Sequence, residues 1–227
     1  MSDLQLLHID TSTDLGSVAF SKGNSIIDCI TNPQPKDHGS FLQPAIQKLM
    51  QTCNFTGNQL DAIVVAEGPG SYTGLRVAMA SAKGLAFAWG KPLITVSTLG
   101  LMTQAAIRQN ANFNYWIPMI DARRMEVFTA VFDATGHEVL SSNALILNES
   151  SYIEWLQRGS CCFFGSGSSK WKSICQHKNA AFIDVSFNAG DMLNIALYKW
   201  EKKLFSKLES VVPNYGKEFY STAQKPK

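Results

Sequence analysis

The stretch GPGSYTGLRVAMASAKGLA, residues 68–86, is the most informative part of this chain. It follows an apolar run at residues 60–67 that is typical of a strand covered on both faces, and it leads into a helical pattern over residues 75–89. Loops in this position can approach phosphate, because helix N-termini favour anions. Thr73 stands where both common nucleotide-binding templates require glycine. The residues therefore leave a phosphate loop and a tight packing turn equally open.

The segments around this stretch predict an α/β fold. Three short strands are expected at residues 4–10, 17–21 and 25–31, and the tight turns between them indicate an antiparallel meander. A helix is expected over residues 38–52, beginning just before Pro44 or with an irregular first turn. A strand at 91–96 and a helix from Ser97 or Thr98 to residue 108 complete the order β-β-β-α-β-α-β-α, which is typical of a mixed sheet with helices on its faces.

The second half of the chain has a weaker pattern. Expected strands lie at residues 114–120, 124–134, 161–164 and 180–185, and expected helices at 150–158 and 191–205. The tail from residue 211 to residue 227 has no period and is expected to be irregular. A length of 227 residues suits two small lobes, or one domain with a side lobe.

Two further segments are candidate phosphate loops. Asp10-Thr11-Ser12-Thr13 lies between two expected strands, where an acid and hydroxyl groups can hold a magnesium-bound phosphate. Gly165-Ser166-Gly167 follows a short strand and could serve the other lobe. An ordinary polar hairpin and a flexible surface turn are the favoured interpretations of the two segments. In the loop that begins at residue 68, Gly68 and Gly70 are the candidate phosphate-binding residues. Arg76, in the helix that follows, could contact a phosphate or a partner's carboxylate.

Two helices with apolar stripes and few charges indicate a helix–helix interface with a partner. Small residues on the second helix permit close approach, and the alternative is that both stripes pack on the chain's own sheet. The candidate interface residues are Phe41, Leu42, Ala45, Leu49, Tyr72, Leu75, Arg76, Met79, Ala82 and Leu85.

Composition excludes several classes of protein. The net charge is +2, and the modest lysine cluster near the C-terminus favours a solvated helix face over an RNA contact. Five cysteines without C-x-x-C spacing argue against a disulfide framework or a zinc site. No histidine has a second ligand at helical spacing, and no G-x-S-x-G elbow occurs. With no signal peptide and no apolar run of membrane-spanning length, we expect a cytoplasmic protein without a membrane contact.

Five segments together resemble the bacterial TsaB (YeaZ) family over essentially the whole chain. They are DTST with GSVAF near the N-terminus, the helix beginning at His38, DAIVVAEGPGSYTGLRVAMASAKGLA, PMIDARRMEVFTAVF and PNYGKEFYSTAQKPK. The resemblance implies two lobes of the actin-like (sugar kinase/Hsp70/actin) superfold, which is ribonuclease H-like. We place them at residues 1–110, the partner-binding lobe, and at 111–227, the smaller lobe.

The resemblance also implies a function in making N6-threonylcarbamoyladenosine, next to the anticodon of tRNAs that read codons beginning with A. The chain would be a scaffold and activator that pairs with a TsaD-type catalytic subunit and a TsaE-type ATPase, meets tRNA through that complex, and forms a homodimer when alone. Leu42 replaces the second histidine of the catalytic paralogue's His-x-x-x-His, so no catalytic residue and no metal are expected. The resemblance implies that no cofactor is required. It leaves open that the chain binds ATP or ADP weakly, or that a nucleotide binds at the interface with TsaD. Met125 departs from an expected glycine.

The sequence leaves two alternative functions open. An actin-fold small-molecule kinase would need a phosphate loop in each lobe and a catalytic acid between them, for which Asp121 is the obvious candidate. A glycoprotease-like peptidase would need metal ligands or a nucleophile, and neither is visible in the sequence.

Overall fold

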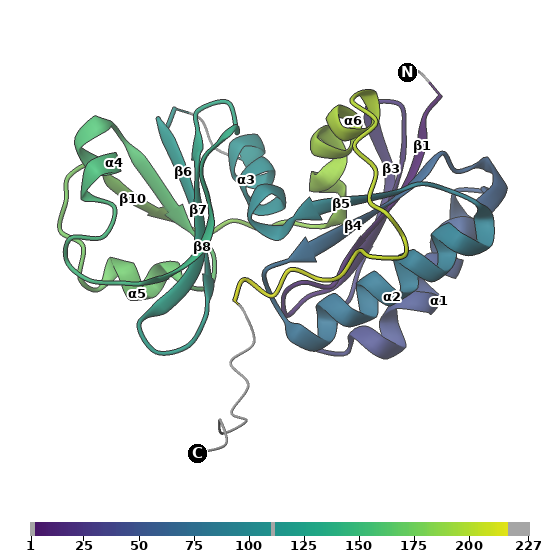
Figure 1. The fold of residues 1–227 in the computed structure, drawn as a ribbon, viewed down its shortest axis with the longest axis horizontal. Coiled ribbons are helices and arrows are strands. Elements are labelled where there is room, and N and C mark those ends of the chain that lie inside the picture. The colour runs from purple at the N-terminus through teal and green to yellow at the C-terminus, as the bar shows by residue number, and fades with distance from the viewer. Residues whose placement is uncertain (1–2, 110–111, 218–227) are drawn as a thin grey trace, which may run out of the picture.

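Two five-stranded mixed sheets with helices around them make up the protein (Figure 1). The structure, a computed structural model, describes residues 3–109 and 112–217. The strand order is β3-β2-β1-β4-β5 in the first sheet and β10-β9-β6-β7-β8 in the second.

The first sheet contains the predicted meander. Its strands are β1 (Gln5–Asp10), β2 (Ser17–Lys22), β3 (Ser25–Thr31), β4 (Ala62–Gly68) and β5 (Leu93–Ser97). The strand β2 pairs antiparallel with both β1 and β3. In contrast, β4 pairs parallel with β1, and β5 pairs parallel with β4. The predicted mixed sheet is therefore confirmed.

The second sheet repeats the same connectivity. Its strands are β6 (Tyr115–Asp121), β7 (Glu126–Asp133), β8 (Glu138–Ile146), β9 (Cys161–Phe164) and β10 (Ala180–Ile183). Here β6, β7 and β8 form the meander, β9 pairs parallel with β6, and β10 pairs parallel with β9. Each half thus consists of an antiparallel three-stranded unit extended by two parallel strands, although their sequence patterns differ in strength.

Helices cover both faces of the first sheet. On one face, α1 (His38–Thr52) and α2 (Tyr72–Trp89) pack on side chains that include Leu7, Ile9 and Val65. On the other face, the 3-10 helix η2 (Ala189–Met192) and α6 (Leu193–Glu201) pack on Leu6 and Val64. The alternation of inward residues along β1 gives each face its own core, as the two-residue period of a strand requires. A short 3-10 helix, η1 (Gly57–Gln59), precedes β4.

The helix α3 (Thr98–Gln109) lies between the two sheets in Figure 1. Leu101 joins the core beneath α6, whereas Leu99, Met102 and Ala106 pack on the second sheet. A helix that is apolar around most of its circumference is buried on several sides. The remaining helices, α4 (Ile153–Arg158) and α5 (Ser168–Lys172), contribute Leu156 and Trp171 to the core on the other side of the second sheet.

Several predicted elements differ from the observed ones. The helix α1 has the predicted bounds, 38–52, and continues through Pro44, an exposed residue inside it, so the alternative start just before the proline does not occur. The helix α2 begins at Tyr72, because the Ser71 hydroxyl caps it by accepting from the N–H of Gly74. The predicted glycine-serine turn continues into α5, and β8 was not predicted at all. The expectation for residues 218–227 lies outside the described residues.

The range 111–227 does not belong to the second sheet alone. Leu193 and Ala196 of α6 are buried against the first sheet, and most of the segment after α6 runs along that half. Ser206 pairs with Leu93 of β5. The division of the chain at residue 110 stays a prediction, but the last quarter of the chain returns to the first half because the apolar face of α6 covers the open face of that sheet.

Candidate functional site

The apolar stripes of α1 and α2 face the chain's own sheet. Five of the ten residues predicted for the partner interface are buried in the first core, and Leu75 is buried as well, so these six side chains face the chain's own interior and not its surface: Leu42, Ala45, Leu49, Leu75, Met79 and Ala82. The physical reason is that two helices lying on one face of a sheet must bury their apolar stripes against it. Phe41 and Leu85 are half-buried against the same core.

The opposite side of α2 is exposed and chemically distinctive. Its exposed residues are Tyr72, Thr73, Arg76, Ala80, Gly84, Phe87 and Ala88. Phe87 is 82% exposed and Tyr72 is 45% exposed, which is unusual for large apolar rings on one helix. Gln43 of α1 donates to Ser81 of α2 over 3.0 Å, so polar residues of α1 lie alongside. We define the exposed α2 residues as the α2 face. Sequence reasoning missed Phe87, although its helical phase, opposite to that of Ala82, could have revealed it.

The glycine loop after β4 packs directly on the turn after β1. The Ser71 N–H donates to the Ser12 carbonyl over 2.7 Å, and the Thr11 hydroxyl donates to the Gly74 carbonyl over 2.7 Å. A Cβ added at Gly70 would lie 2.0 Å from the Ser12 carbonyl oxygen. The two segments predicted to cradle phosphate are thus brought together, but they bind each other.

These residues do not fit a magnesium-bound phosphate as they are folded. The Ser12 N–H, which an anion would need, donates to Asp10 Oδ1 over 2.9 Å, and a carbonyl oxygen faces Gly70. Asp10 is buried, and burial raises the pKa of its carboxyl despite the hydrogen bond that it accepts from the Ser12 N–H. Asp10 Oδ2 and Ser12 Oγ have no partner within the described residues, yet both are shielded from solvent. For the glycine loop at residues 68–74, the geometry therefore favours a packing turn over a phosphate loop.

The second glycine pair is also a packing turn. Gly165 has a φ of +95°, which favours glycine, and a Cβ there would lie 2.5 Å from the Met119 carbonyl oxygen. The Gly167 N–H donates to that same carbonyl over 3.0 Å. Close approach of the backbone to β6 therefore accounts for both glycines.

Asp121, the acid considered for a kinase, forms an ion pair. Lys170 Nζ lies 2.6 Å from its Oδ1 and also donates to the Glu126 carbonyl over 3.1 Å. Although partial burial acts to raise the pKa of Asp121, hydrogen bonds from Lys170 and the Arg123 N–H lower it below its usual value. Asp121 is thus held as a carboxylate in a structural pair.

Met125 is compatible with the turn that precedes β7. The left-handed residues of that turn are Arg123 and Arg124, with φ of 71° and 50°, and Met125 is not among them. The Met125 carbonyl accepts from the Leu147 N–H over 2.7 Å, and its side chain is 40% exposed. The expected requirement for glycine at this position therefore does not hold.

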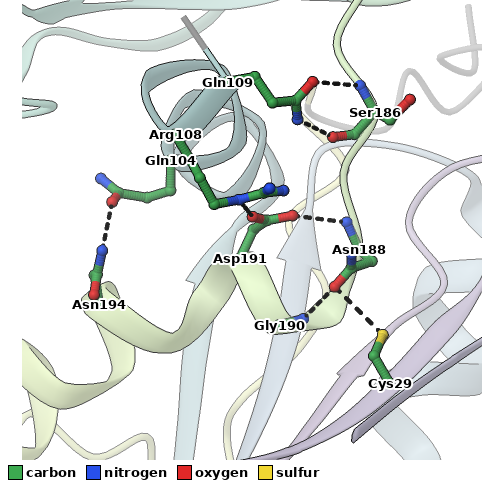
Figure 2. Close-up of polar contacts among 9 residues, drawn as sticks. All are labelled: Cys29, Gln104, Arg108, Gln109, Ser186, Asn188, Gly190, Asp191 and Asn194. Atoms are coloured by element: carbon green, nitrogen blue, oxygen red, sulfur yellow. Dashed lines mark hydrogen bonds and ion pairs between the residues drawn. The ribbon is translucent and has the colours of Figure 1, made fainter. Parts of the chain in front are cut away.

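A cavity of about 450 Å³ opens where β3, α3 and η2 meet. Figure 2 shows the polar network beside it: Arg108 Nε donates to Asp191 Oδ1 over 2.9 Å, and the other Asp191 oxygen accepts from the Asn188 N–H over 3.0 Å. The Asn188 side chain in turn accepts from the Gly190 N–H and the Cys29 thiol. The network ties the end of α3 to the segment that returns the chain to the first sheet.

The described residues contain no group of three or more His, Cys, Asp or Glu side chains that could hold a metal ion. Across the same residues, no helix is long and apolar enough to span a membrane.

The fold and its two paired turns define a class: the ribonuclease H-like fold of the actin-like ATPases. The activator of the 2-hydroxyisocaproyl-CoA dehydratase from Clostridium difficile shares this fold, with a TM-score of 0.51 at 10% identity, over 90% of this chain and 99% of that one. A family model described as TsaD, tRNA N6-adenosine threonylcarbamoyltransferase, matches residues 26–205.

Similarity to individual proteins is more specific. The tRNA threonylcarbamoyladenosine biosynthesis protein TsaB of Haemophilus influenzae is 31% identical over 222 residues, which cover 92% of each chain. YeaZ from Pseudomonas aeruginosa superposes with a TM-score of 0.80 at 26% identity, over 93% of this chain and 99% of that one. The chain belongs to the TsaB (YeaZ) family.

Proposed function

We propose that this chain is a non-catalytic scaffold and activator for threonylcarbamoylation of the adenosine next to the anticodon, in tRNAs that read codons beginning with A. It pairs with a TsaD-type catalytic subunit, and the pair recruits a TsaE-type ATPase in the cytoplasm. The observation that carries the proposal is its 31% identity to a protein named for threonylcarbamoyladenosine biosynthesis, across 92% of both chains.

The arrangement of the site supports a binding role. The turns that line a phosphate site in a kinase of this fold are here bonded to each other, and Asp121 is engaged by Lys170. The α2 face, by contrast, presents two exposed aromatic rings with small residues between them. Small residues let a second helix approach closely, and aromatic residues are enriched at protein interfaces. We therefore place the partner contact on the α2 face, which also serves a homodimer when the chain is alone.

This chain needs no cofactor of its own, and any bound ATP or ADP sits at the interface with the TsaD-type subunit. tRNA meets the complex mainly through the other subunits, because the net charge of +2 is small for an RNA-binding surface.

Reconstitution tests the proposed function. Purified TsaD-type and TsaE-type subunits, a threonylcarbamoyl-AMP synthase and unmodified tRNA are incubated with and without this chain, and the modified nucleoside is quantified by mass spectrometry. We expect modification only when the chain is present, and no turnover by the chain alone. Modification at the full rate without it would contradict the proposal.

A further inference from the structure

The chain after α6 crosses the first half as an ordered segment, residues 206–217, which we call the C-terminal strap (Figure 1). The Ser206 N–H donates to the Leu93 carbonyl of β5 over 2.8 Å. Leu208 and Val211 pack against the core beneath α2, and Lys83 of α2 donates to the Val211 carbonyl over 3.0 Å. The first part of the strap is therefore fixed by both polar and apolar contacts.

The end of the strap lies on the glycine loop. The Asn214 N–H donates to the Glu67 carbonyl over 2.7 Å, and a Cβ added at Gly68 would lie 2.0 Å from the Asn214 carbonyl oxygen. Gly216 packs against Phe128 of β7 and the Pro69 ring, and Lys217 forms an ion pair with Glu126. The strap is thus held from both halves of the molecule.

Between these anchors, Tyr215 lies on the exposed surface of α2. Its ring centroid is 4.9 Å from that of Tyr72, and its hydroxyl accepts from Arg76 Nε over 3.0 Å. The Arg76 guanidinium lies 4.2 Å from the Tyr72 ring centroid and 6.0 Å from that of Tyr215. Two residues of α2 and one residue 139 positions further along the chain therefore form one cluster.

This cluster leaves part of the arginine available. Arg76 is exposed, and within the described residues its Nη groups have no hydrogen-bond acceptor. Glu126 of β7, which lies beside the end of the strap, is already paired with Lys217. A guanidinium held between aromatic rings presents a planar pair of donors, which matches the geometry of a carboxylate. Tyr and Arg are also the residues most often found at interface hot spots.

We propose that Tyr72, Arg76 and Tyr215 form a recognition site for an acidic side chain of the TsaD-type subunit. The strap holds Tyr215 in place and so orients the guanidinium, which lowers the entropy lost on binding. This inference rests on the proposed function, because it names the chemistry by which the α2 face recognises that partner.

The test uses the full chain and the purified TsaD-type subunit, with affinity measured by calorimetry. Tyr215→Ala removes the ring and the acceptor, Tyr215→Phe removes the acceptor alone, and Arg76→Lys keeps the charge but loses the planar donor pair. Tyr198→Ala is the matched control, because Tyr198 is 57% exposed on α6, which covers the opposite face of the first sheet. Circular dichroism and thermal unfolding check that each variant is folded.

We expect Tyr215→Ala and Arg76→Lys to raise the Kd at least about tenfold, Tyr215→Phe to raise it less, and Tyr198→Ala to leave it unchanged. The wild-type affinity should fall with added salt, because a surface carboxylate–guanidinium contact is screened. Wild-type affinity in folded Tyr215→Ala would overturn the recognition site and leave the proposed function standing. Absence of any complex with the wild-type chain would overturn both. Unchanged partner affinity with weakened tRNA binding would show that the cluster contacts RNA, and would also overturn the inference.

Discussion

Gly70 illustrates how a glycine motif can serve packing instead of a ligand. The sequence could not decide between these uses, because both require a residue without a side chain after a buried strand. In the structure, the Ser12 carbonyl occupies the space where a Cβ would lie. Gly84 of α2 is the opposite case, since a Cβ there would meet nothing within 4 Å.

This contrast gives a matched pair of variants. Gly70→Ala should destabilise the fold by roughly 1–3 kcal/mol, because the backbone of Ser12 must move. Gly84→Ala should stabilise it by about 0.5–1 kcal/mol, because alanine restricts the unfolded chain and suits a helix interior. Urea unfolding monitored by circular dichroism measures both. Equal stability of the two variants would show that the loops are not packed as described.

At the scale of elements, the helix α2 was predicted correctly, and its apolar stripe follows the alternative in which it packs on the chain's own sheet. The apolar stripe of Ala78, Met79 and Ala82 is what periodicity detects, and it packs on β4 and β1. The exposed positions lie between the stripe residues, where Ala80, Gly84 and Phe87 carry no helical signal of their own. A single sequence shows where a helix is amphipathic, but the identity of the surface that covers the apolar side depends on the neighbouring elements.

Acidic substitutions on the two sides of α2 separate folding from docking. Ala82→Glu should destabilise the fold by more than about 4 kcal/mol, because it buries an unpaired charge in the first core. Ala80→Glu should change stability by no more than about 0.5 kcal/mol, yet weaken the complex with the TsaD-type subunit at least about tenfold, because it adds a charge at the contact. Thermal unfolding and calorimetry are the two measurements. Normal binding by a folded Ala80→Glu variant would show that the partner does not contact the α2 face at this position.

Considered as a whole, the molecule consists of two halves with the same connectivity, held together by segments that cross between them. The helix α3 contributes to the cores of both sheets, and the chain returns from β10 through η2 to the first sheet. The Arg108–Asp191 pair fixes this return, with the Asp191 side chain only 6% exposed (Figure 2). A nearly buried carboxylate that accepts two hydrogen bonds contributes more than an exposed ion pair does.

Asp191→Asn should therefore destabilise the fold by roughly 1–3 kcal/mol, since the amide cannot accept from both Arg108 and Asn188 as a carboxylate does. Glu154→Gln provides the control: the Glu154–Arg158 pair is exposed and lies within α4, so its loss should cost at most about 0.5 kcal/mol. Chemical denaturation at neutral pH compares the two variants. A loss in Asp191→Asn no larger than in Glu154→Gln would contradict the role of the network.

The sequence by itself determined the elements and the family. Apolar periodicity predicted the meander, the central strand and the helices of the first half, because local spacing reflects which residues face a core. Its GPGSYTGLR and DARR segments indicated the TsaB family, and the comparisons confirmed that family. In the second half β8 escaped detection, since most of its residues are exposed or half-buried at a sheet edge and lack a clear alternation.

Only the tertiary structure decided how residues far apart in the chain are used. It assigned the glycines of both loops to backbone packing, turned the apolar stripes of α1 and α2 toward their own sheet, and brought Tyr215 beside Tyr72 and Arg76. These outcomes depend on which surfaces meet after the chain has folded back, and the strap meets α2 because both lie over the same core. No local pattern encodes such a meeting, because it is set by contacts between positions more than a hundred residues apart.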